Sequence, residues 1–437
     1  MHIVQFLGKI QVFKKISFMI LALCLSGCGQ MAGQRQRVTY GAPSVYEPYE
    51  TEDFERGGFD KDTFKVAMIL PLSGKASTFG KGLQNAAMMA LEDTHNRKLQ
   101  VRFYDTKSSA QGAADAVAEA FNNDVELVLG PLMLEEVSAV ADIARHKRVP
   151  LISFSASPQV LGGGVYTLGL LSNEQINRII SYAAQKGRRK IAVVVADTDA
   201  GLNIAKSAFD AAGANGVEIT KIGFFEPSSL EFSELVQEMI KTKDFDTVLI
   251  AETGNRLKAI AGTFGYYDVA YPDVLFIGTS VWENTNLTKE TTLFKGVYPS
   301  IARVHQDYFN KKYKDLFGEM PNALYVYAYD GVALASALST KRGRDLHEAI
   351  EDEDGYIGIN GTFRLFSDGT NEHTLDIVEV DPSGLKVVNS APRKFGPRNV
   401  NMNGVSSSRP EIYGKNPEVV YQKLMPVQKT PSYFYLF

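Results

Sequence analysis

The chain has 437 residues, which is enough for two or three domains of ordinary size. Hydrophobic residues make up 45% of it and charged residues 22%, a composition typical of a globular protein with a large core. The formal net charge is −4. A mildly acidic chain gives no electrostatic reason to expect a nucleic-acid partner, or a membrane surface bound through charge alone.

The first 28 residues carry the most specific pattern in the sequence. The basic pair Lys14-Lys15 precedes an apolar run from Ile16 to Leu25, which is too short to span a bilayer as a helix but has the length of a signal-peptide core. The run closes with Leu25-Ser26-Gly27-Cys28, which resembles a lipobox. The resemblance implies that residues 1–27 are a signal peptide, that Cys28 carries a lipid and that the mature protein is a periplasm-facing membrane lipoprotein. Gly29 after the cysteine favours the outer membrane. The alternative is an uncleaved anchor that ends in cysteine.

Cysteine and histidine usage argues against metal and disulfide chemistry. Cys24 lies in the segment that would be removed, and Cys28 would be acylated, so the mature chain would have no thiol for a disulfide or a structural zinc site. The six histidines show no spacing typical of metal ligands. We therefore expect no metal and no cofactor, and a fold that is stabilised by its core.

Two polar segments flank the part of the chain that has regular patterning. Residues 28–62 have no sustained period and predict a flexible tether. Residues 390–437, in which prolines are scattered among Asn, Ser and Lys, predict a mostly disordered tail. The tail ends in the apolar cluster Tyr433 to Phe437, which either docks on the folded part or stays free.

Between these tails, short apolar runs alternate with segments of helical periodicity. The first half predicts strands at 64–70, 101–104, 125–129 and 150–154, with helices at 79–96, 110–122 and 135–146. The alternation then restarts, with strands at 190–196, 217–224, 247–251 and 274–277, and helices at 176–186, 204–212, 232–241 and 257–264. Helices at 304–317 and 325–339 and strands at 361–366, 374–380 and 385–388 follow. This order predicts an α/β protein with two parallel sheets, each covered by helices on both faces.

Four segments resemble landmarks of the leucine/isoleucine/valine-binding family of periplasmic binding proteins. They are Lys65 to Gly82, Val128 to Leu132, Leu151 to Pro158 and Gly361 to Gly369. The resemblance implies two Rossmann-like lobes of the type I periplasmic-binding-protein fold, joined by three crossover strands. It assigns 63–170 and 300–358 to lobe 1 and 171–299 and 359–389 to lobe 2, with crossings near 168–172, 297–302 and 357–361. Ligands of open parallel sheets bind outside the carboxyl ends of the strands, so we expect a ligand cleft there.

The resemblance also assigns ligand-binding positions on lobe 1. Ser73 lies before the first helix, where it either binds an anionic ligand group or only caps the helix. Phe79 matches an aromatic wall of the ligand site. The segment Ser155-Ala156-Ser157 matches the positions that hold the α-carboxylate of an amino acid, and its alternative is a serine-rich turn whose hydroxyls bond locally.

On lobe 2 the match to an amino-acid site is incomplete. Thr253 stands where the family has an aromatic residue, and Ser280 stands where an acidic residue holds the α-ammonium group. A buried ammonium without a carboxylate is costly, so Glu252, one position away from Thr253, is the alternative anchor. The only tryptophan, Trp282, either caps the cleft or lies in the core.

Catalytic patterns are absent from the sequence. Gly74-Lys75 lacks the Ser or Thr that follows the lysine of a phosphate-binding loop, and Gly278 to Trp282 lacks the second glycine of a nucleophile elbow. We therefore expect a binding protein and not an enzyme.

Two functions remain open. The first is the capture of an amino-acid-like ligand for an ABC permease. The second follows from Gly130-Pro131-Leu132, which also resembles the C-terminal module of the penicillin-binding-protein activators. These are lipid-anchored proteins of the same fold that stimulate peptidoglycan synthases, and their N-terminal helical-repeat domain has no counterpart here.

Overall fold

The computed structural model describes residues 63–302, 305–396 and 409–425. The predicted signal peptide, the lipidated Cys28 and the tether at 28–62 lie outside the described residues. None of the described helices combines the length and the apolar character that crossing a bilayer would need.

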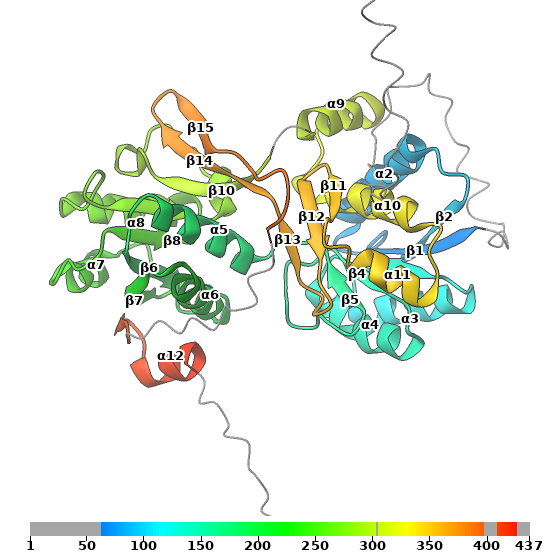
Figure 1. The fold of residues 1–437 in the computed structure, drawn as a ribbon, viewed down its shortest axis with the longest axis horizontal. Helices are drawn as coiled ribbons and strands as arrows, with labels where there is room; N and C mark the ends of the chain where they lie inside the picture. The colour runs from blue at the N-terminus through cyan, green and yellow to red at the C-terminus, as the bar shows by residue number, and fades with distance from the viewer. Residues whose placement is uncertain (1–62, 303–304, 397–408, 426–437) are drawn as a thin grey trace, which may run out of the picture. The chain divides into compact units, whose positions relative to one another are not determined.

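The first sheet has five parallel strands in the order β2-β1-β3-β4-β5 (Figure 1). Its strands are β1 (Phe64–Leu70), β2 (Leu99–Asp105), β3 (Leu127–Leu129), β4 (Leu151–Ser153) and β5 (Val165–Thr167). The helices α2 (Ser77–Thr94), α3 (Ala110–Asn122) and α4 (Leu134–Lys147) connect them. Six of the seven residues of β1 are buried, because helices cover both faces of the sheet. Val66 and Met68 pack with α2, and Ala67 and Ile69 pack with α3 and α4.

The second sheet repeats this plan in its centre. Five parallel strands lie in the order β7-β6-β8-β9-β10, which is the strand order of the first sheet. They are β6 (Lys190–Ala196), β7 (Glu218–Phe225), β8 (Thr247–Ile250), β9 (Leu275–Gly278) and β10 (Val297–Ile301). The connecting helices are α5 (Ser172–Gln185), α6 (Asp199–Asn215), α7 (Ser233–Ile240) and α8 (Gly254–Tyr266). The predicted α/β class with two parallel sheets is confirmed.

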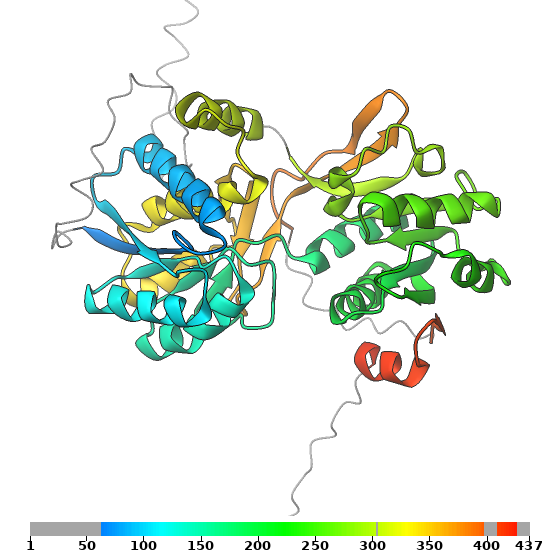
Figure 2. The same cartoon turned by 180° about the vertical axis from the view of Figure 1, so that it is seen from behind.

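Three further strands extend the second sheet at its two edges. At one edge the antiparallel strands β14 (Leu375–Asp381) and β15 (Gly384–Asn389) follow β10. At the other edge β16 (Glu411–Tyr413) pairs in parallel with β7, and the helix α12 (Pro417–Leu424) follows it (Figure 2). Residues 409–425 are therefore folded, which corrects the predicted tail for this segment.

A small antiparallel sheet follows the two repeats in the chain. It consists of β11 (Tyr356–Gly358), β12 (Gly361–Leu365) and β13 (Asn371–His373), and it follows the helices α9 (Gln306–Phe317), α10 (Val326–Leu338) and α11 (Gly343–Ile350). Tyr356, Phe363 and Leu365 share a core with α2 and α10. Residues 359–373 thus pack with the first sheet, and the chain reaches the second sheet only at β14. The predicted boundary between the lobes at residue 359 lies inside this small sheet. The turn between β11 and β12 is a hairpin and not the predicted crossing from one large sheet to the other.

Candidate functional site

The two sheets share a strand order that reverses at one point, and this point positions the candidate residues. In the first sheet the order reverses between β1 and β3, and in the second between β6 and β8. Loops that leave the carboxyl ends of parallel strands at such a point splay apart, so ligands of open α/β sheets bind there. Ser73 follows β1, Ser155 and Ser157 follow β4, Thr253 follows β8 and Ser280 follows β9. Every predicted ligand-binding residue except Phe79, which lies on α2, therefore follows the carboxyl end of a parallel strand. Ser73 and Thr253 follow strands at the reversal itself, and the others follow the next strand in the sheet.

The hydroxyl of Ser73 is already engaged by a carboxylate. Ser73 Oγ donates to Asp105 Oδ2 at 2.6 Å, and the backbone N–H of Ser73 donates to Asp105 Oδ1 at 3.0 Å. The backbone N–H of Lys107 donates to the same Oδ1 at 2.8 Å. Partial burial works to raise the pKa of Asp105, but these hydrogen bonds outweigh it and hold the pKa below its ordinary value. The position beside Ser73 therefore carries a stable negative charge.

The amino end of α2 is also partly occupied by the chain itself. The N-cap residue is Ala76, and no side chain of this helix caps it, so the prediction that Ser73 only caps the helix is wrong. Ala76 N–H donates to Ser108 Oγ at 3.0 Å, and Ser77 N–H donates to the carbonyl of Gly74 at 3.3 Å. Two of the N–H groups that could bind an anion thus have partners. Phe79, one turn further, is 38% exposed and can contact a ligand.

The serine segment in the loop after β4 has hydroxyls with few partners among the described residues. Ser155 is buried, and its carbonyl accepts from Thr167 Oγ1 at 2.5 Å, which fixes the loop against β5. Within the described residues its hydroxyl makes no hydrogen bond. Ala156 is exposed and Ser157 is half-buried, with its Oγ accepting from Gln159 N–H at a long 3.5 Å. Two hydroxyls on a rigid loop can therefore bind a carboxylate or hydroxyl group.

The loop after β8 holds its polar groups within the chain. Thr253 is the N-cap residue of α8, and its Oγ1 lies 3.0 Å from Oγ1 of Thr285, which also accepts from Gly254 N–H at 2.7 Å. Glu252 pairs with Arg256, with Nε to Oε2 at 3.0 Å. The alternative ammonium anchor is therefore neutralised by an arginine on α8, the helix that follows it.

The loop after β9 is closed by packing. The backbone N–H of Ser280 donates to Gln175 Oε1 at 2.8 Å, and Ser280 begins a short 3-10 turn, Ser280–Asn284. Trp282 is fully buried, and its Nε1 donates to the carbonyl of Ile250 at 2.9 Å. The core interpretation of Trp282 is thus confirmed. Its ring lies where the side chain of any residue larger than glycine at position 278 would be.

Sequence reasoning missed Asp105 and Gln175, which hold the two loops. Asp105 ends β2, and its contact with Ser73 arises because β1 and β2 are paired, with Leu70 opposite Asp105. One sequence signal could have identified Asp105, namely an acidic residue at the carboxyl end of the predicted strand that pairs with β1. Gln175 lies on the buried side of α5, where nothing in the sequence distinguishes it.

The side chains in these loops present hydroxyl, amide and carboxylate groups. Within residues 63–302, 305–396 and 409–425, no group of three or more histidine, cysteine, aspartate or glutamate side chains is placed to hold a metal ion. Glu136, in the first turn of α4, is buried, and burial raises its pKa although Thr106 Oγ1 donates to it at 2.7 Å. Its side chain is part of the packed interior.

A family model of periplasmic binding proteins matches residues 63–385. The chain belongs to the periplasmic binding protein family. A solved structure of a putative branched-chain amino acid ABC transporter from Rhodospirillum rubrum matches 75% of the chain and 100% of its own length, with a TM-score of 0.64 and 19% identity. The predicted resemblance and the type I fold are thereby confirmed.

Other relatives of this periplasmic binding protein differ in ligand and in size. A solute-binding protein from Rhodopseudomonas palustris, solved with 3,4-dihydroxybenzoic acid, covers 77% of the chain and 99% of its own length, with a TM-score of 0.53 and 19% identity. Glutamate receptor 2.6 of Arabidopsis thaliana is 22% identical over 382 residues, which are 76% of the chain. The chain spans only 39% of that receptor.

Proposed function

We propose that this protein is a solute-binding protein that captures a small ligand at the carboxyl ends of its parallel strands and delivers it to an ABC permease. The observation that carries the proposal is the serine segment Ser155 to Ser157, whose hydroxyls have few partners within the described residues. Thr167 holds this segment at the strand ends, where ligands of this fold class bind. The family points to a periplasmic location. The lipid on Cys28 and the outer membrane remain part of the proposal.

The polar groups at the two sheets narrow the class of ligand. A zwitterionic amino acid needs an anion for its ammonium group, and Glu252 is already paired with Arg256 while Ser280 carries no charge. We therefore narrow the predicted amino-acid-like ligand to a small carboxylate or neutral molecule without an α-ammonium group. The dihydroxybenzoate bound by the protein from Rhodopseudomonas palustris is of this kind.

A thermal-shift screen tests the proposal. Benzoate, 3,4-dihydroxybenzoate, leucine and isoleucine would be compared on the purified protein and on its S155A/S157A variant. A ligand at one hundred times its dissociation constant stabilises a protein by about 2.7 kcal/mol. We expect an aromatic carboxylate to raise the melting temperature of the wild type and not of the variant. A shift with leucine instead would restore the amino-acid prediction.

A second candidate function is supported by the predicted ligand-site groups that already have partners within the chain. Ser73 is bound to Asp105, Glu252 to Arg256, and Trp282 is buried under the loop after β9. Each of these contacts removes a group that could have bound an amino acid. We propose as the alternative that the chain binds a protein, as a regulator of a peptidoglycan synthase of the penicillin-binding-protein class.

The same preparation separates the two candidates. The regulator would bind a purified peptidoglycan synthase and raise its glycan-polymerising or cross-linking rate, with no thermal shift from any small molecule in the panel. The solute-binding protein would give the opposite pattern. We expect no catalysis by the chain in either case. Recovery of every screened ligand in chemically unchanged form after incubation with the protein checks this.

A further inference from the structure

The segment 409–425 lies outside the family match, which ends at residue 385, and it is docked on the edge of β7. Three residues of β16 pair in parallel with β7, with Glu411 opposite Lys221, Ile412 opposite Ile222 and Tyr413 opposite Gly223. Strand addition to an exposed sheet edge is a common mode of peptide recognition. Here the added strand comes from the same chain, after the undescribed residues 397–408.

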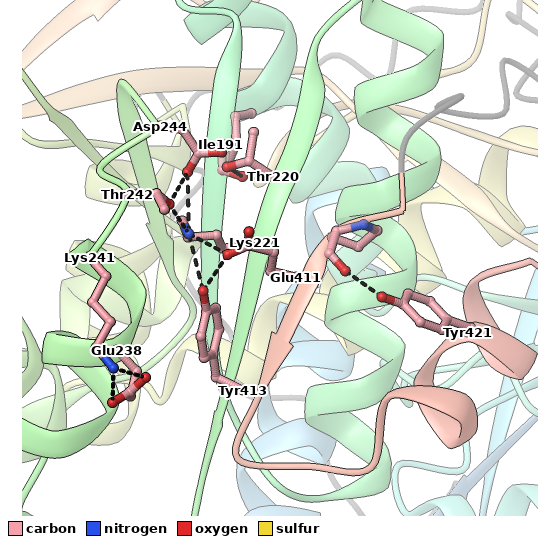
Figure 3. Close-up of polar contacts among 11 residues, drawn as sticks. Ile191, Thr220, Lys221, Glu238, Lys241, Thr242, Asp244, Glu411, Tyr413 and Tyr421 are labelled. Carbon is pink, nitrogen blue, oxygen red and sulfur yellow. Dashed lines mark hydrogen bonds and ion pairs between the residues drawn. The ribbon is translucent and has the colours of Figure 1, made fainter.

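A single buried cation receives this strand (Figure 3). The side chain of Lys221 is 0% exposed, and its Nζ lies 2.6 Å from Glu411 Oε2 and 3.1 Å from the hydroxyl of Tyr413. The hydroxyl of Tyr413 also donates to Glu411. On the other side Nζ donates to Thr242 Oγ1 at 2.7 Å and lies 3.3 Å from Asp244. Two of the four partners of this lysine therefore belong to the docked segment.

The residues after β16 fix the segment by packing and by local geometry. Gly414 has φ +72, and a Cβ there would lie 2.0 Å from the carbonyl oxygen of Phe224, so only glycine fits the turn. Lys415 pairs with Asp197. The buried side chains of Val420 and Leu424 on α12 then join the core formed by α5 and α6.

We propose that the edge of β7 around Lys221 is a peptide-docking site, that residues 409–425 are its ligand, and that they dock and leave as a unit. An extended Glu-x-Tyr-Gly strand followed by a short amphipathic helix is the chemistry that the site recognises. Lys221 selects the strand because the departure of the segment would remove two of the four partners of its ammonium group.

The ionisation of the docked groups supports this role for Lys221. Burial works against the charge on Lys221, but the hydrogen bonds to Glu411 and Tyr413 and the charge of Asp244 outweigh it and raise the pKa of Lys221. The hydrogen bond from Lys221, with a smaller contribution from Tyr413, lowers the pKa of Glu411. A carboxyl whose pKa falls on docking contributes to docking above its ordinary pKa, and this contribution is lost as the pH falls through the docked value.

Hydrogen exchange on the full chain tests the role of the ion pair. We expect E411Q to raise the exchange rate of the amides of 411–424 by at least tenfold, and K221M to do the same, while the amides of β6 and β8 keep their protection. K241M is the matched control, since the ammonium group of Lys241 pairs with Glu238 and, among the described residues, has no ion pair with the docked segment. Unchanged protection of 411–424 in E411Q would overturn the proposal. If K221M unfolds the whole second sheet, E411Q alone decides the outcome.

Binding of a peptide from solution tests whether the site is a docking site. A fluorescent peptide with the sequence of residues 409–425 would be titrated into the wild type, E411Q and the double variant K221M/E411Q, all as full chains. The chain's own segment competes at high effective concentration, so E411Q should bind the peptide at least tenfold more tightly than the wild type, and K221M/E411Q should lose this gain. Equal binding to all three chains would overturn the proposal.

Discussion

Nδ1 of His373 lies 3.3 Å from Oε2 of Glu174, and both side chains are buried. Glu174 is in the first turn of α5, and His373 ends β13, so the pair joins the two stretches of chain that lead into the second sheet. The second carboxylate oxygen of Glu174 has no hydrogen-bond partner among the described residues. Burial raises the pKa of Glu174 to about 7, with His373 opposing the rise and Glu372 adding to it.

This buried carboxyl should make stability fall as the pH rises. Its pKa is higher in the folded chain than in the unfolded chain, so its contribution to the free energy of unfolding is full below about 4.5 and is lost as the pH rises to about 7. We expect the stability of the wild type relative to E174Q to decline across this window, by at most about 1.4 kcal/mol per pH unit. Urea unfolding at several pH values measures the difference. The exposed Glu348 gives the control E348Q, which should follow the wild type; parallel curves for wild type and E174Q would contradict the prediction.

Asp330 supports the small sheet from a buried position on α10. Its Oδ1 accepts from Ile359 N–H at 2.8 Å, and Oδ2 accepts from Asn360 N–H at 3.5 Å. D330A would leave these buried donors without partners, and we expect it to destabilise the fold by about 2–3 kcal/mol. D330N keeps an acceptor and should cost less. Denaturant unfolding checks the order, and an equal loss in both variants would show that the carboxylate charge matters more than the acceptor.

Gly278 leaves the space that Trp282 fills. A Cβ at residue 278 would lie 2.1 Å from Cε2 of the indole, so G278A must displace the ring, with a cost of roughly 1–3 kcal/mol or more. Because Trp282 is the only tryptophan, its fluorescence should shift to the red in this variant. Gly262 on α8 has open space around its Cβ position, so G262A should be neutral or slightly stabilising. An unshifted emission spectrum in G278A would refute the packing argument.

Asp105 should limit the affinity for an anionic ligand that binds at the carboxyl ends of the strands of the first sheet. Two unit charges about 4 Å apart repel by about 1 kcal/mol in water and by more near a protein surface. D105N should therefore tighten the binding of an aromatic carboxylate several-fold and leave that of a neutral analogue unchanged. Titration calorimetry with both compounds measures this. A tenfold loss of affinity in D105N would mean that Asp105 itself binds the ligand.

The alternation of apolar runs with helical periodicity was sufficient to predict most elements of the two large sheets. Strands such as β1 and β6 are buried on both faces, and they appear in the sequence as continuous apolar runs. Helices such as α3 have one apolar stripe, and the bounds of α3 were predicted to the residue. The three-residue strand β5 and the eight-residue helix α11 were missed, since segments this short carry too few periods.

The small sheet and the C-terminal strand show where local pattern is insufficient. Phe363 and Leu365 alternate as expected for a strand, but alternation does not say against which core the strand packs. The strand β16 has only three residues, and Glu411 in it is bound by Lys221, which is 190 positions earlier in the chain. Partners this distant in the chain are selected by the folded surface and leave no local period.

The candidate site likewise has features that the sequence predicted and features that only the tertiary structure shows. The sequence by itself determined the fold class and which loops leave the carboxyl ends of the strands, because periodicity and the succession of strands and helices along the chain are properties of local segments. Only the tertiary structure decided which hydroxyls are available to a ligand: Ser73 is bound to Asp105, whereas Ser155 makes no hydrogen bond through its hydroxyl within the described residues. The physical reason is that a hydrogen bond between neighbouring strands depends on their pairing in space, which brings together residues that are far apart in the chain.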